Sequence, residues 1–126
     1  MKKIICIILA MVMVFAFVTS AFADTVTYTN MRVYGGSSQQ VYTNNRVNSS
    51  TIDVTITSYS YMQSGFKFRG YNHANGSTCT ALSTVITGNG DWHAGYTSFP
   101  TVVTVKMSIT SSDPTVYLVW SGTIAA

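Results

Sequence analysis

The stretch GNGDWHAGYTSFP, residues 88–100, gathers side chains of the kinds that line binding sites for polar ligands. Aromatic rings can stack on the faces of sugar rings, while amide, carboxylate and imidazole groups fix the orientation of a ligand through hydrogen bonds. The sequence therefore predicts a ligand-binding site in this stretch, with a glycan as the favoured ligand. The candidate contact residues are Asn89, Asp91, Trp92, His93 and Tyr96. Tyr59 with Tyr61, and the segment 71–73, Tyr-Asn-His, are the second and third candidates for such a site.

Packing is the alternative role for the large aromatic residues of this stretch. Trp92 and Phe99 lie near a predicted hairpin, where large rings often close the end of a hydrophobic core. Trp120 stands in a different setting, because Leu118 and Val119 precede it in an apolar run. We expect Trp120 to be a core residue.

The potential metal ligands do not predict a metal site or a bound cofactor. His73, Cys79, Asp91 and His93 are suitable ligand types for zinc, which needs all its ligands within about 2.3 Å. The predicted hairpins described below place the two histidines at opposite ends of one strand. That separation argues against a shared metal ion.

The acidic residues also fail to predict an enzyme. Glycosidases typically use two carboxyl groups held about 5–9.5 Å apart. Asp113 precedes a proline in a predicted turn, Asp53 lies on the polar face of a predicted strand, and Asp91 is the third internal candidate. No Gly-x-Ser-x-Gly motif marks a nucleophilic serine. We expect a protein that is not an enzyme.

The N-terminus has the features of an export signal. Lys2 and Lys3 precede the apolar run 4–18, and residues 21–23, Ala-Phe-Ala, match the small-x-small pattern of a cleavage site. We expect cleavage after Ala23 and release of residues 24–126 as one domain, by a bacterium. No later stretch is apolar for the roughly 18–20 residues that span a membrane.

Removal of the signal changes the charge and the cysteine content. Loss of Lys2 and Lys3 leaves five cations against four aspartates, so the formal net charge falls from +3 to +1. Five cations scattered along the chain do not predict nucleic-acid binding, which needs a dense cationic surface. Cys79 is then the single cysteine, so no internal disulfide forms. We expect a buried Cys79, with an intermolecular disulfide or a reactive thiol as the alternatives.

The elements that must carry these residues are strands. Thr, Val, Ile, Tyr and Phe dominate the chain, and apolar and polar residues alternate in 51–61 and 102–110. Ile52, Val54 and Ile56 face one way, and their polar neighbours face the other. The predicted strands are 25–34, 51–61, 66–71, 78–87, 102–110 and 115–124.

Two Asn-Gly pairs predict tight hairpins. Two-residue type I′ turns favour Asn-Gly because both central residues need positive φ. A turn at 75–76 would place Tyr71 opposite Thr80 and His73 opposite Thr78. A turn at 89–90 would place Ile86 opposite His93 and Thr87 opposite Trp92.

Short strands joined by turns predict an all-β protein, an antiparallel β-sandwich of six to seven strands and immunoglobulin-like in size. A small barrel is the less favoured arrangement. The composition and the candidate site together predict a secreted binding protein that contacts a cell-surface or cell-wall glycan. The alternative is a self-associating surface, matrix or toxin-like protein, because few lysines protect the sheet edges from pairing.

Overall fold

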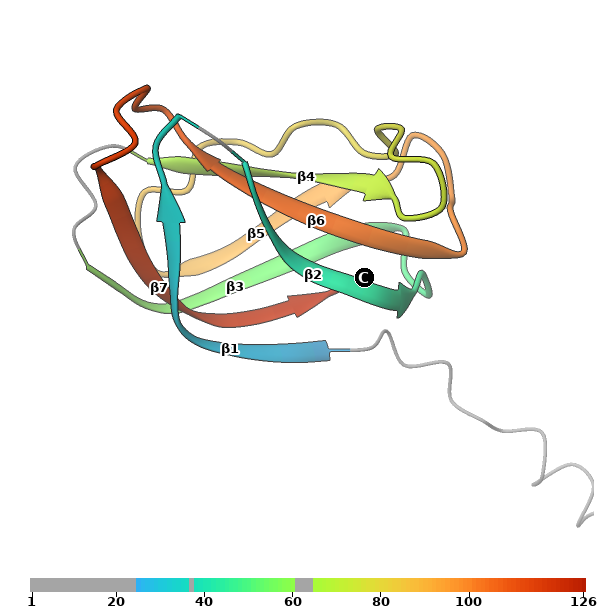
Figure 1. Ribbon diagram of the computed structural model, residues 1–126. Coiled ribbons are helices and arrows are strands. Elements are labelled where there is room, and N and C mark those ends of the chain that lie inside the picture. The colour runs from blue at the N-terminus through green and yellow to red at the C-terminus, as the bar shows by residue number, and fades with distance from the viewer. Residues whose placement is uncertain (1–24, 37, 61–64) are drawn as a thin grey trace, which may run out of the picture.

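The computed structural model describes residues 25–36, 38–60 and 65–126, and its regular elements are strands in two antiparallel sheets (Figure 1). Sheet A has the strand order β1-β7-β3-β5, and sheet B has the order β2-β6-β4. The two sheets stack as a sandwich and do not close into a barrel, which confirms the predicted fold class. The expected signal peptide lies outside the described residues. The strands are β1 (Thr25–Tyr34), β2 (Gln39–Arg46), β3 (Thr51–Ser60), β4 (Phe66–Asn72), β5 (Gly90–Gly95), β6 (Val102–Ile109) and β7 (Tyr117–Ala125).

The alternating strands pack as predicted. Ile52, Val54 and Ile56 of β3 are buried, and so are Val103 and Met107 of β6. Each strand thus gives its apolar side to the space between the sheets and its polar side to the outside. The period-2 pattern was a reliable guide here because both strands have a solvent-facing side.

One core lies between the two sheets. Trp120 is 0% exposed, as expected, and its ring centroid lies 5.6 Å from that of Tyr28 and 6.5 Å from that of Phe66. Cys79 is also buried, and burial raises the pKa of its thiol. The cysteine therefore acts as a small apolar residue in this core.

Strand β2 was missed in the sequence, which predicted no strand between 34 and 51. Its register against β6 shifts between Gln40 and Tyr42 and again between Tyr42 and Asn45. These irregularities put the neighbours Val41 and Tyr42 both in the core. A strand with such bulges loses the simple alternation that would have identified it.

The predicted strand 78–87 is wrong, because this segment makes only isolated bridges. Figure 1 shows the chain between β4 and β5 running beside β4. The Thr80 hydroxyl accepts a hydrogen bond from the Gly70 amide at 2.8 Å, and the Ser83 hydroxyl accepts one from the Phe68 amide at 2.9 Å. Hydroxyls thus replace backbone carbonyls as acceptors, which prevents a regular ladder while still covering the β4 edge.

The predicted register at 75–76 is also wrong. Tyr71 pairs with Thr78 instead of Thr80, and a four-residue loop, 73–76, separates Asn72 from Ser77. Gly76 has a φ of 72°, but Asn75 is not among the residues with positive φ, so the turn is not type I′. The side chains of Asn72 and Asn75 instead accept hydrogen bonds from backbone amides two residues later, which stabilises the longer loop.

The second Asn-Gly pair makes a crossing between sheets instead of the predicted hairpin. Ile86 bridges Phe66 beside sheet B, whereas His93 pairs with Asp53 and Trp92 with Val54 in sheet A. Gly90, with a φ of 136°, begins β5 at the point where the chain enters sheet A. A local turn signal cannot distinguish a return to the same sheet from a step to the other one.

Candidate functional site

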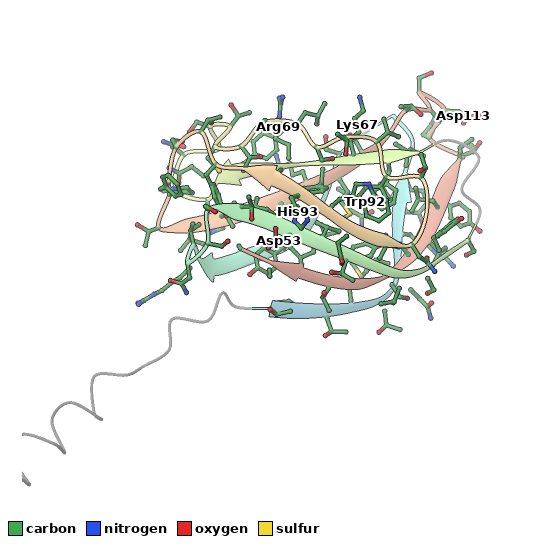
Figure 2. The ribbon with its side chains drawn as sticks, turned by 180° about the vertical axis from the view of Figure 1, so that it is seen from behind. Asp53, Lys67, Arg69, Trp92, His93 and Asp113 are labelled. Carbon is green, nitrogen blue, oxygen red and sulfur yellow. The ribbon has the colours of Figure 1, made fainter. Side chains whose placement is uncertain are left out.

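The predicted site is divided between the two sides of β5. Asp91 and His93 are exposed on the outer face of sheet A, whereas Trp92 points inward and packs, half-buried, against the core. Figure 2 shows His93 and Asp53 together on β5 and β3. Asn89 is exposed in the connection that precedes β5.

On the outer face of sheet A the charged groups have close partners. His93 Nδ1 lies 2.6 Å from Asp53 Oδ1, and their side chains are 60% and 41% exposed. The Thr55 hydroxyl donates to Asp91 at 2.6 Å. The sequence linked His93 only to Asp91, because the pairing of β5 with β3 was not known. This arrangement is a set of local hydrogen bonds on an open surface.

Tyr96 lies just beyond β5 and faces away from Asp91 and His93. Its hydroxyl is buried without a hydrogen-bond partner in the described part of the chain, and burial raises its pKa. Its ring centroid is 5.5 Å from that of Phe99. Phe99 is 69% exposed, so it does not take the alternative role of closing the end of the core. The five predicted residues thus do not converge on one surface.

A different surface gathers side chains that the sequence left apart. Strand β4 alternates, so that Phe66 and Phe68 are buried while Lys67 and Arg69 point outward from sheet B. Figure 2 shows Lys67 and Arg69 on the opposite side of the sandwich from Asp53 and His93.

The neighbouring strands add further cations to this surface. Arg69 pairs with Lys106 of β6, and Arg46 of β2 pairs with Val102, which faces outward beside the buried Val103. Four of the five lysines and arginines in the described residues therefore share the outer face of sheet B, and no described aspartate lies on it. We call this surface the basic face, which comprises Arg46, Lys67, Arg69, Tyr71, His73, Thr104 and Lys106.

Aromatic and polar groups lie among these cations. The Lys106 ammonium group is 4.7 Å from the centroid of the Tyr71 ring, a cation–π arrangement. His73 Nδ1 is 2.9 Å from the Thr104 hydroxyl. A shallow hollow of about 220 Å³ lies among these groups, and a second of about 230 Å³ adjoins it. The hollows are bordered by Tyr71, Asn72, His73, Gly76, Thr104 and Lys106 and by Ala74, Thr101 and Val102.

No aspartate among the described residues lies beside the cations of the basic face. Arg69 stands opposite Lys106 and two residues from Lys67, and like charges at cross-strand positions repel each other. Arg69 Nε is buried and has no hydrogen-bond partner among the described residues. Cations held side by side at the cost of their mutual repulsion are suited to an anionic ligand.

The sequence named the segment 71–73 as a candidate site, but it missed the cations around that segment because they are far apart in the sequence. Arg69 and Lys106 become neighbours only through the register of β4 against β6. One signal was present, since Lys67 and Arg69 alternate with Phe66 and Phe68 and must share the outer side of a strand. That pair could have identified half of the surface.

Sheet A has a smaller aromatic surface at its other end. The guanidinium carbon of Arg32 lies 5.2 Å from the centroid of the Tyr117 ring, and the rings of Tyr34 and Tyr117 are 5.7 Å apart. The charge of Arg32 is thus held against a ring within its own sheet. It does not extend the basic face.

Other kinds of site find no support among the described residues. No group of three or more His, Cys, Asp and Glu residues within 25–36, 38–60 and 65–126 could hold a metal ion. His73 lies beside sheet B, while His93 lies on the outer face of sheet A. In the same ranges, no helix is both long and apolar enough to cross a membrane.

Comparisons with known proteins do not place the chain in a family. No protein-family model matches the sequence, and no curated protein matches it.

Proposed function

We propose that the protein is an exported, non-enzymatic binding module that holds an anionic cell-surface glycan against the basic face. The observation that carries the proposal is the gathering of Arg46, Lys67, Arg69 and Lys106 on the outer face of sheet B, around Tyr71. Carboxylate or phosphate groups of a polymer would accept hydrogen bonds from these cations. The hollow beside Tyr71 would receive part of a sugar residue.

The dimensions of the basic face suit a linear polymer. Strand β4 rises about 3.3 Å per residue, so the surface from Lys67 to His73 is roughly 20 Å long. That length accommodates several sugar residues. Each cation near an anionic surface contributes about 1 kcal/mol, which for four cations corresponds to a Kd near 1 mM before any contribution from Tyr71.

A nucleic acid fits this face less well than a glycan. Sequence-tolerant binding of single strands relies on successive aromatic side chains on which bases stack. The basic face has one such ring, Tyr71, and Lys106 already lies over it. Expected export of the chain also places it where anionic glycans are the more common polymers.

The originally predicted site supports the proposal less than the basic face does. Asn89, Asp91 and His93 are exposed, but Trp92 and Tyr96 turn toward the interior. An aspartate beside the exposed histidine would also repel an anionic polymer. A contact from this side would therefore require a neutral glycan.

The alternative of self-association through sheet edges is also less well supported. Residues 77–86 hydrogen-bond along β4 and so occupy one edge of sheet B. Two of the remaining described edges, β1 and β2, contain register shifts, which is how many natural sheets avoid pairing with another chain. The fourth edge, β5, is only six residues long, and the Ala81 amide donates a hydrogen bond to the Gly95 carbonyl at its end.

Calorimetric titration with three polymers tests the proposal. We expect polygalacturonate, a carboxylated glycan, to bind, with an affinity that falls as salt is raised. Neutral dextran should not bind, and single-stranded DNA should bind more weakly than polygalacturonate. The triple variant Lys67→Gln/Arg69→Gln/Lys106→Gln should weaken polygalacturonate binding by roughly 100-fold, since it removes three contributions of about 1 kcal/mol.

Arg32→Gln is the matched control, because it removes a cation from the other sheet and should leave binding unchanged. Equal binding by the triple variant and the wild type would overturn the proposal. Stronger binding of DNA than of polygalacturonate would indicate a nucleic-acid binder. A preference for dextran would favour the site predicted from the sequence, residues 89–96, as the glycan contact.

A further inference from the structure

The outer face of sheet A has the opposite charge at one end. Asp53 of β3 and Asp91 of β5 both project from this face, and they are two of the three aspartates in the described residues. Asp113, the third, lies in the connection between β6 and β7. Partly exposed acids therefore gather on one outer face and cations on the other.

The two charged groups have matching spacing. Asp53 pairs with His93 and Asp91 with Thr55, so the two aspartates are diagonal neighbours across β3 and β5. Lys67 and Lys106 are diagonal neighbours across β4 and β6 in the same way. Diagonal positions on antiparallel strands lie about 7–8 Å apart, so the pairs can meet charge to charge.

These faces belong to different sheets and point away from each other, so they cannot meet within one molecule. We propose that the basic face of one copy docks on the β3–β5 half of the outer face of sheet A in a second copy of this chain. Lys67 and Lys106 of one copy would lie against the two aspartates of the next. The contact is head to tail, so it can repeat and form an open row of copies.

The surface around the aspartates permits close approach. Its rows carry mostly small side chains, with Thr55 opposite Thr123 and Asp53 opposite Ala125. The cation of this face, Arg32, pairs with Val119, about six residues along β7 from Ala125 and so roughly 20 Å away. Among residues 25–36, 38–60 and 65–126, the docking half of the face therefore carries no lysine or arginine.

The predicted contact is weak and sensitive to salt. Three strands of about eight residues present roughly 400 Å² of flat sheet per copy, about half the area of a standard interface on each partner. Electrostatic attraction must then supply much of the affinity, and salt screens it beyond a distance of about 10 Å at 0.1 M. The glycan of the proposed function would occupy the same basic face and so separate the copies.

Sedimentation velocity over a concentration series tests the inference. At about 0.02 M salt we expect the average sedimentation coefficient of the wild type to rise with concentration, and at about 0.5 M salt we expect it to stay constant. Two charge-reversed variants sharpen the test. Asp53→Lys/Asp91→Lys and Lys67→Glu/Lys106→Glu should each stay monomeric at low salt, and an equimolar mixture of the two should associate again.

The neutral variant Asp53→Asn/Asp91→Asn keeps the test decisive if charge reversal prevents folding. It should associate about tenfold more weakly than the wild type, as expected for the loss of two exposed ion pairs. A wild type that remains monomeric at low salt would overturn the inference, and so would association that these substitutions do not change.

The outcome for the glycan is separate. Asp53→Asn/Asp91→Asn retains the basic face without adding cations and should bind polygalacturonate like the wild type. Loss of self-association with retained polymer binding would therefore contradict only the inference. If the wild type does not bind the polymer but does self-associate, only the proposed function is contradicted.

Discussion

The two outer faces of this sandwich differ in how they treat charge. On sheet A, Asp53 lies beside His93 and Asp91 accepts a hydrogen bond from Thr55. On sheet B, cations lie beside one another, with no aspartate on that face in the described part of the chain. The acids of sheet A have local hydrogen-bond partners and are proposed above to add only a weak contact with a second copy, whereas the like charges of sheet B are suited to an anionic partner from outside.

Packing does not require this difference. The inner sides of β3 and β4 are equally apolar, with Ile52 and Val54 on one strand and Phe66 and Phe68 on the other. Either strand could carry neutral residues outside without a change in the core. The cations of β4 are therefore better explained by binding than by folding.

The largest effect on stability is expected from a substitution in the core beneath the basic face. Phe68→Ala should lower the free energy of unfolding by about 3–5 kcal/mol, because the buried ring packs in the core that both sheets share. Chemical denaturation should show a single transition for both faces. Two transitions would show that the faces belong to separate units, and Leu82→Ala, at an exposed position, should have little effect.

The next effect concerns the hydroxyls that support β4. Ser83→Ala and Thr80→Val should each cost about 1–3 kcal/mol of stability, because each leaves a buried β4 amide without its acceptor. Denaturation of the exposed-site control Thr84→Ala should stay within about 0.5 kcal/mol of the wild type. Equal stability of all these variants would show that the hydroxyls do not hold the β4 edge.

A smaller effect is expected on sheet A. Asp53→Asn should cost at most about 1 kcal/mol, because the pair with His93 is largely exposed. The affinity for polygalacturonate should stay within about twofold of the wild type. A large loss of that affinity would break the contrast between the two faces.

The smallest effect is expected at the turn before β7. The Thr115 amide and hydroxyl both donate to Asp113 and lower the pKa of its carboxyl below 3.8. A lowered folded-state pKa stabilises the protein above the pKa of the unfolded chain, and that stability is lost as pH falls through the folded value. Thermal melts should show Asp113→Ala slightly less stable than the wild type near neutral pH and equal to it in strong acid. A difference that persists in acid would contradict this assignment.

Much of the fold could be predicted because local alternation reports burial directly. The order of apolar and polar residues in β3 and β6 predicted which side of each strand faces the core. Segments shaped by tertiary contacts could not be predicted in this way. The hydroxyls of Thr80 and Ser83 act on an amide of another segment, and the crossing at Gly90 depends on the pairing of β5 with β3.

The candidate site was harder to predict for the same reason. Proximity in the sequence suggested residues 89–96, but alternation along a strand sends Trp92 and His93 to opposite sides. The basic face depends on strand register, which brings Lys106 beside Arg69. Register is a property of the assembled sheet, so the sequence alone could group neighbours in one segment, such as Lys67 with Arg69 or Tyr71 with His73, but not the two strands.

Amine labelling with and without polygalacturonate tests the central claim most directly. Once the expected signal is removed, Lys67 and Lys106 are the only lysines of the chain, and both lie on the basic face. Mass spectrometry should show both lysines protected when the polymer is bound, while the N-terminal amine reacts at its usual rate. Unchanged labelling of both lysines in the presence of bound polymer would contradict the account.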